Sequence, residues 1–289
     1  MLKQKALRKI LITSITIVIL LMIYLMPTNN KSSINTLNID KKIEYIDKKV
    51  GYIYLLNDND LLVKVNVLMN DSDSLNEKVI DILNNLLNND ATAKELRRVI
   101  PNKTKILNTE IDDDYLSVSF SKDILNIDEK YQEKLIESIA YSIFEIGEIK
   151  KISIYVEEEN INKYFSFVPE IITRDFGINK KYDIKSFRDI QKVVVYYIDE
   201  IDNNKYFVPV TSYINDDEEK IKIIIESLSS SYIYEPNLIS LLNNNTELIN
   251  YEINDDIMLL NFNNSIFISD GNILEEVIYT ISSSVFDSY

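Results

Sequence analysis

The sequence contains a long internal repeat. Asn102–Leu107 returns as Asn244–Ile249, a shift of 142 positions (244 − 102). The same shift carries Ile82–Leu86 onto Ile224–Leu228. One shift that links helix-like and strand-like segments in order indicates two copies of a whole domain, and not a solenoid of short units. Such duplication is common among binding and assembly modules, whereas an enzyme with one site has no obvious need of it.

Composition removes several classes of chemistry. The chain has 289 residues, 46% of them hydrophobic, so each copy is long enough to bury a core. Cysteine and histidine are both absent. This excludes disulfides, thiol nucleophiles, Cys or His metal sites and an imidazole base. We therefore expect no metal and no cofactor, and any enzymatic alternative has to use carboxylates, Lys or Tyr.

The charge of the chain is strongly acidic. Its formal net charge is −15, and four cations within residues 1–9 contribute +4, which leaves −19 (−15 − 4) for the rest. Phosphates of nucleic acids and anionic lipid surfaces repel such a domain. We expect neutral or basic protein partners and no nucleic acid, with simple solubility as the alternative explanation.

The N-terminus predicts a membrane anchor. Residues 1–9 form a basic cytoplasmic region, and residues 10–26 form an uncharged apolar run at the short end of what spans a bilayer. No small-residue cleavage pattern follows, so we favour an uncleaved signal anchor over a cleaved signal peptide. The basic flank predicts that the folded part lies outside the cytoplasm. Residues 27–49 are polar and read as a tether.

The first copy, residues 50–156, predicts an α+β domain with the order β-β-α-β-β-α-β. Alternation, helical spacing and turn residues place its elements. The expected strands are 51–56, 61–68, 104–111, 115–120 and 149–156, and the expected helices are 74–87 and 131–146. Gly147 is expected to end the second helix as a C-cap.

The second copy, residues 191–289, predicts the same order without its last strand. Its expected strands are 192–198, 206–211, 246–253 and 257–262, and its expected helices are 216–229 and 271–286. The counterpart of the strand 149–156 would fall at 291–298, so either the chain is truncated or this sheet lacks a strand. We expect an open strand edge there. Residues 157–190 form a linker whose aromatic content predicts that it packs on a domain.

Several segments resemble the sporulation and spore-germination domain family of the GerM type. Val193–Tyr197, a turn and Tyr206–Thr211 are similar to the family's tyrosine-bearing strand and the strand resembling LVPVTR. Leu241–Leu248 resembles the turn into its third strand, although Asn replaces the usual Pro that the first copy keeps as Pro101. Ile171–Asn179 resembles the family's inter-domain connection. Together with the duplication and the anchor, the resemblance covers residues 50–289.

The resemblance implies a non-catalytic, membrane-attached protein outside the cytoplasm that acts in endospore formation. Its partners would be proteins of a sporulation membrane complex, with self-association as a further option. The domains would be similar to the ring-building motif of secretion and sporulation channels. Without cysteine, lipoprotein anchoring is out of reach. Two alternatives stay open, namely a carboxylate-dependent cell-wall hydrolase and a small-ligand receptor domain.

Three groups of residues are candidate sites. Tyr54, Tyr196 and Tyr197 form either an interaction surface or part of the core. The acidic runs at 58–60, 70–73, 112–114 and 254–256 resemble calcium-loop fragments or paired carboxylates, but turns explain them better because the calcium-loop Gly and Glu are missing. The basic linker residues form either a docking face or contacts with the acidic domains; they are Arg174, Lys180, Lys181, Lys185 and Arg188.

Overall fold

The computed structural model describes residues 49–88, 95–183, 188, 190–215, 219–230, 238–254, 257–266 and 274–289. Residues 47–289 form one compact unit. The predicted anchor at 10–26 lies outside the described residues. Within the described ranges, no helix is long and apolar enough to cross a membrane.

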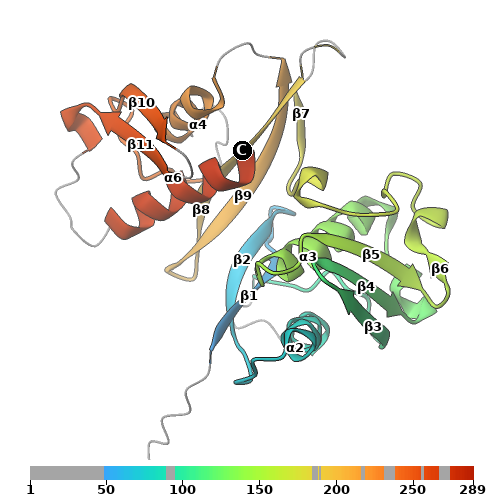
Figure 1. Ribbon diagram of the computed structural model, residues 1–289. Helices are drawn as coiled ribbons and strands as arrows, with labels where there is room; N and C mark the ends of the chain where they lie inside the picture. The colour runs from blue at the N-terminus through green and yellow to red at the C-terminus, as the bar shows by residue number, and fades with distance from the viewer. Residues whose placement is uncertain are drawn as a thin grey trace, which may run out of the picture. The chain divides into compact units, whose positions relative to one another are not determined.

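The first copy has the predicted order of elements (Figure 1). A hairpin is followed by a helix, a second hairpin, a second helix and a strand. The elements are β1 (Val50–Leu56), β2 (Leu62–Leu68), α2 (Leu75–Asn88), β3 (Ile106–Asp112), β4 (Tyr115–Phe120), α3 (Gln132–Phe144) and β5 (Lys151–Val156). Gly147 has a φ of 85°, as expected of a residue that ends a helix.

The second copy repeats this order up to its last helix. Its elements are β8 (Ile190–Ile201), β9 (Asn204–Asn215), α4 (Lys220–Ser229), β10 (Leu248–Asn254), β11 (Ile257–Phe262) and α6 (Leu274–Ser288). The copies match in detail, since the hairpin turns place Asp60 and Asp202 at positive φ and a register shift interrupts β3–β4 and β10–β11 alike. The predicted fold of two tandem α+β domains, the second without its last strand, is confirmed for the described residues.

The opening hairpins of both copies join one sheet. β2 pairs antiparallel with β9, and Lys64 lies opposite Phe207. β8 pairs with β9 along its whole length, and the linker strand β7 (Lys181–Asp183) pairs parallel with the far end of β9. Because β9 is the second copy's version of β2, equivalent strands meet at the junction between the copies.

The closing elements form separate sheets. In the first copy, β4 pairs antiparallel with β3 and parallel with β5, and the linker strand β6 (Glu159–Asn160) continues this sheet. In the second copy, β10 and β11 form a two-stranded sheet among the described residues. The predicted open edge is therefore present in the described structure.

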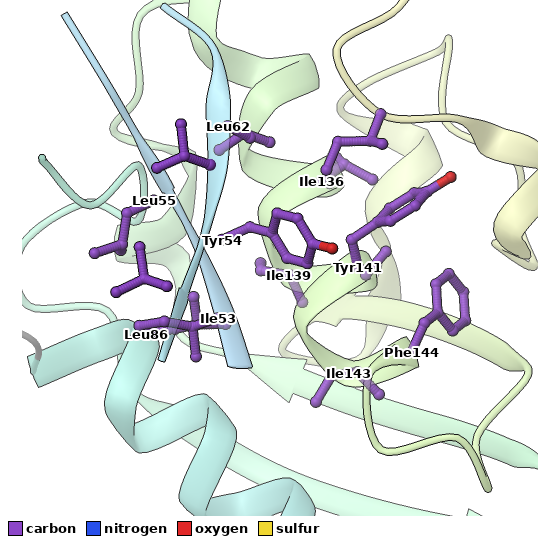
Figure 2. Close-up of a cluster of buried hydrophobic side chains, with 14 of the residues drawn as sticks. Ile53, Tyr54, Leu55, Leu62, Leu86, Ile136, Ile139, Tyr141, Ile143 and Phe144 are labelled. Carbon is purple, nitrogen blue, oxygen red and sulfur yellow. The ribbon is translucent and has the colours of Figure 1, made fainter. Parts of the chain in front are cut away.

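The core of the first copy lies between its hairpin and its helices. Helix α3 packs on β1, and Figure 2 shows the ring of Tyr54 extending from β1 toward α3, beside Tyr141. The two rings meet edge to face, with centroids 6.0 Å apart. In the second copy, α4 and α6 pack on β8 in the same way.

The linker packs on the domains, as its aromatic residues predict. Its buried apolar residues are Ile161, Phe165, Val168, Ile172 and Ile178. The backbone of Ile172 pairs with that of Ile152 and so covers part of β5. The linker thus completes the first copy and does not act as a free hinge.

Candidate functional site

The tyrosines predicted as a possible surface are buried. Tyr54, Tyr196 and Tyr197 are exposed by 0%, 2% and 3%. The predicted interaction surface of exposed tyrosines is therefore wrong, and the alternative prediction, that these residues are buried, is correct. The reason is that the strands β1 and β8 are covered by helices, so their aromatic side chains point into the cores.

Two of these tyrosines each bind a buried carboxylate, in matching positions. The Tyr54 hydroxyl donates to Glu145 Oε1 at 2.7 Å, and the Tyr196 hydroxyl donates to Asp287 Oδ2 at 2.6 Å. Each residue of the second pair lies 142 positions after its counterpart, as 287 − 145 shows. The repeat therefore preserves a hydrogen-bonded pair, although the sequence pattern of Glu145 and Asp287 did not single them out.

Serine hydroxyls hold the same strands to their helices. The Tyr54 amide donates to Ser142 Oγ and the Tyr196 amide donates to Ser284 Oγ, both at 2.9 Å. Ser138 donates to the Tyr54 carbonyl at 2.7 Å. These small residues let each helix approach the strand closely and satisfy backbone groups that a strand edge would otherwise leave unpaired.

Two cations complete the cluster between the copies. Lys64 Nζ lies 2.5 Å from Glu145 Oε2 and donates to the hydroxyl of Tyr279, a second-copy residue, at 2.7 Å. Arg174, from the linker, donates to Asp287 Oδ1 at 2.8 Å and to the Phe144 carbonyl at 2.9 Å. Each cation therefore bridges the two copies. We call these six residues the junction cluster; they are Tyr54, Lys64, Glu145, Arg174, Tyr196 and Asp287.

Asn179 of the linker forms a second bridge at the junction. Asn179 is 2% exposed. Its Oδ1 accepts a hydrogen bond from the Leu62 amide, and its Nδ2 donates to the carbonyls of Leu62 and Pro209, all at 2.8 Å. It has a φ of 50°, a conformation that asparagine tolerates better than most residues. Its amide group thus joins β2 to β9 where Pro209 has no N–H to offer.

The surroundings shift the pKa values of the cluster. Burial raises the pKa of the Tyr54 and Tyr196 hydroxyls well above 10.0, and the nearby acidic groups raise them further. Burial alone would lower the pKa of Lys64, but Glu145 and Tyr279 outweigh it and the pKa is raised. Burial would likewise lower the pKa of Arg174, but the charge of Asp287 and other nearby acidic groups outweighs burial and the pKa is raised. At neutral pH the cluster holds two protonated tyrosines and two charged cations.

Two clefts flank the junction cluster. The larger, of about 750 Å³, is lined by Arg174, Lys192 and Phe286 among others, and the smaller, of about 420 Å³, by Lys64 and Tyr279. Two of the cations in the larger cleft have acidic partners, since Arg174 binds Asp287 and Lys192 Nζ lies 3.0 Å from Asp175 Oδ1. A ligand would have to compete with these contacts.

The carboxylates of the cluster are poorly placed for acid–base work. Each carboxylate is held on both sides. In Glu145 and in Asp287, one oxygen accepts a hydrogen bond from a tyrosine and the other accepts one from a cation. A substrate proton would have to reach a carboxylate that a tyrosine and a cation already hold in place. This arrangement can fix two domains against each other, and it satisfies every member of a buried polar network.

The acidic candidates from the sequence lie in turns. Asp58–Asp60 forms the β1–β2 turn, where Asn57 Oδ1 accepts the amides of Asn59 and Leu61 at 3.0 and 2.8 Å. Asp71 and Asp73 both pair with Lys49. Asp113 has a φ of 55° in the β3–β4 turn. Asn254 ends β10, and the run it opens continues outside the described residues.

No group of three or more acidic side chains in the described ranges is arranged to hold a metal. The basic linker residues contact the acidic domains where they are described. Arg174 binds Asp287, and Lys180 Nζ lies 2.7 Å from Glu133 Oε1. Lys181 and Arg188 also have interactions, and Lys185 lies outside the described residues. For Arg174 and Lys180, the structure supports the prediction of contacts with the acidic domains over that of a docking face.

The chain is similar to known proteins over most of its length. A family model described as "Germane: Sporulation and spore germination" matches residues 52–162 and 194–286. "Spore germination protein GerM" of Bacillus subtilis (strain 168) is 25% identical over 199 residues, 66% of this chain and 53% of that protein. The chain thus spans about half the length of this relative.

A solved structure shares the fold. The "Tandem GerMN domains of the sporulation protein GerM from Bacillus subtilis" match with a TM-score of 0.69 at 18% identity, covering 84% of this chain and 88% of that one. A duplicated α+β architecture is therefore common to both.

Proposed function

Since the chain belongs to the Germane family of sporulation and spore-germination proteins, we propose that it is a non-catalytic assembly protein anchored outside the cytoplasmic membrane. The resemblance to GerM-type domains is confirmed by the family match and the shared fold. The anchor is residues 10–26, the tether is residues 27–49, and the tandem domains contact other proteins of a sporulation membrane complex.

One observation carries the assembly role. Large apolar side chains are exposed on the closing elements of the second copy, with Ile257 at 62%, Leu259 at 54% and Phe286 at 74%. Further exposed residues there are Ile249, Ile253, Leu274 and Ile278. Exposed apolar groups that gather on one surface mark protein contact sites, and Ile257 and Leu259 share one face of β11. The junction cluster supports the same role because its contacts join the two copies within one compact unit.

The hydrogen bonds that tie Glu145 and Asp287 to tyrosines and cations speak against the hydrolase alternative. The ion pairs of Arg174 and Lys192 in the larger cleft speak against the receptor alternative. Asp113, in the acidic run 112–114, lies in the β3–β4 turn at a φ of 55°.

The test is co-purification after cross-linking from sporulating cells of the native host. Ile249→Lys should reduce the recovery of partner proteins and the yield of heat-resistant spores. Leu107→Lys is the matched control, because Leu107 is the equivalent residue of the first copy and is 53% exposed, against 61% for Ile249. Equal loss from both variants, or from neither, would contradict a contact surface on the second copy.

The anchor has a separate test. External protease should digest the domains in intact protoplasts, while a tag placed before residue 10 should stay protected. A tag digested together with the domains, or domains protected as a whole, would contradict the proposed topology.

A further inference from the structure

Strand β5 shows what completes a closing sheet in this protein. β5 lies parallel to β4, with Ser117 opposite Ser153 and Ser119 opposite Tyr155. Its side chains alternate, and the apolar set Ile152, Ile154 and Val156 is at most 1% exposed. With β5 paired at this edge, the inner residues of β4 are fully buried; they are Leu116, Val118 and Phe120.

Strand β11 is the counterpart of β4 and lacks this cover. Among the described residues β11 pairs only with β10 (Figure 1). Its inner residues Met258, Leu260 and Phe262 correspond to the buried set of β4, yet they are only half-buried. The same side of the sheet is therefore finished in one copy and open in the other.

Within the described residues, the sequence of β11 carries none of the side-chain features that protect an edge strand, and the register shift of this sheet lies on β10. Natural edge strands are blunted by charges, proline or bulges. β11 reads Ile-Met-Leu-Leu-Asn-Phe, without a charge, a proline or a glycine. Its outward positions 257 and 259 are Ile and Leu, where β4 has Tyr115 and Ser117. This edge can accept a strand without charge repulsion.

Charge argues for a different protein as the occupant, and not for a second copy. The chain carries −15, so two copies repel each other. The strand that fills this place in the first copy starts at Lys151 and directly follows Lys150, and Lys151 Nζ lies 3.1 Å from Asp114 in the β3–β4 turn. A partner strand with a basic start would suit the acidic chain.

We propose that β11 binds an extended segment of a partner protein as a parallel strand, in the register that β5 takes on β4. The segment has a basic start, β-branched apolar residues at alternate positions that face inward, and small or polar residues between them. Main-chain hydrogen bonds supply the affinity and the alternate side chains supply the specificity. This rests on the proposed assembly function and names the kind of partner segment that the second copy binds.

Register-specific disulfide cross-linking tests the proposal, since the chain has no cysteine of its own. The protein is residues 47–289, one compact unit with both cores. The probe is a peptide copying residues 149–156, with either Ser153→Cys or Tyr155→Cys. Adjacent strands place cysteines within disulfide range. A peptide that exchanged into the first copy would find no cysteine there.

Parallel addition predicts a specific pattern. The Ser153→Cys peptide should link several-fold faster to Leu259→Cys than to Asn261→Cys. The Tyr155→Cys peptide should show the reverse preference, for Asn261→Cys. A matched peptide with Ile152, Ile154 and Val156 all changed to Asn should link slowly to both.

Three results would overturn the proposal. One is equal rates for all pairs. Another is linkage of the Tyr155→Cys peptide to Ile257→Cys, which marks antiparallel addition. The third is disulfide dimers of Leu259→Cys protein forming faster than peptide adducts, which marks self-association. Failure here with normal co-purification of partners from cells would refute strand addition alone and leave the assembly function standing.

Discussion

Asn57 and Asp199 occupy the same position in the two copies and bind each other, with Asn57 Nδ2 2.6 Å from Asp199 Oδ2. A residue that touches its own counterpart lies next to an axis of twofold symmetry. The antiparallel pairing of β2 with β9, which are also counterparts, agrees with such an axis. The two copies therefore pack as a homodimer would, fused into one chain.

The two copies depart from symmetry in the cations that pair with their equivalent carboxylates. Glu145 receives Lys64, from the first copy, whereas Asp287 receives Arg174, from the linker. Symmetry would place a lysine at position 206, but that position is Tyr206. The linker thus supplies the charge that the second copy lost.

Asn57→Asp should weaken the junction. It keeps the oxygen that accepts the amides of Asn59 and Leu61, but it replaces the donor facing Asp199 by a second carboxylate. We expect a loss of roughly 1–3 kcal/mol in the free energy of unfolding by urea, smaller at acidic pH. Asp199→Asn, the matched control, keeps an acceptor for Asn57 and should cost less. An equal cost for both variants would refute this account.

Lys64→Met should be strongly destabilising because it leaves Glu145 buried with one partner fewer. Removing one member of a buried pair costs about 3–5 kcal/mol, measured by chemical denaturation. Lys205→Met is the control, since Lys205 pairs with Glu276 at the surface, where the expected cost is about 0–1 kcal/mol. If the two variants lose the same stability, the junction pair has no special role.

Alkaline pH should unfold the protein through its buried tyrosines. The pKa of Tyr54 and Tyr196 is raised in the fold, so above pH 10.0 the unfolded chain ionises first and the free energy of unfolding falls as pH rises. The raised pKa of Lys64 acts in the same direction, because its contribution is lost as pH rises through that pKa. Ultraviolet titration should show a late group of tyrosines that ionises together with unfolding, and a smaller late group in Tyr54→Phe. Ionisation of all tyrosines in one early step would contradict this.

Hydrogen exchange should separate the two closing sheets. Amides of residues 248–262 should exchange faster than those of 106–120, because among the described residues β11 pairs on one side only, whereas β4 pairs on both. Mass spectrometry on the monomer measures both stretches in one sample, so each is the control for the other. Equal protection would mean that the edge of β11 is already satisfied.

Asp113→Asn should leave sporulation unchanged. Asp113 lies in a tight turn at a φ of 55°, and asparagine adopts that conformation as readily. Spore yield is the readout, with circular dichroism to check the fold. Loss of function with the fold intact would revive the hydrolase alternative.

The sequence predicted the elements better than the contacts among them. The strands 115–120 and 257–262 have the predicted bounds, because short alternating runs between turn residues leave little freedom. Strand β9 runs to Asn215, well beyond the expected 211, because β7 and β8 both pair with that end. Tyr54 and Tyr196 could not be assigned to surface or core, since tyrosine suits both.

By itself the sequence determined the duplication and the order of elements in each copy, up to the last helix of the second. These are local patterns of period, turn and spacing, which a single chain displays directly. Only the tertiary structure decided that β2 meets β9, that Tyr54 and Tyr196 bind Glu145 and Asp287, and that Arg174 and Asn179 of the linker close the junction. Contacts of this kind join residues 142 positions apart, as in Asn57–Asp199, or 215 apart, as in Lys64–Tyr279. They depend on burial, because each polar group must find a partner once water is excluded.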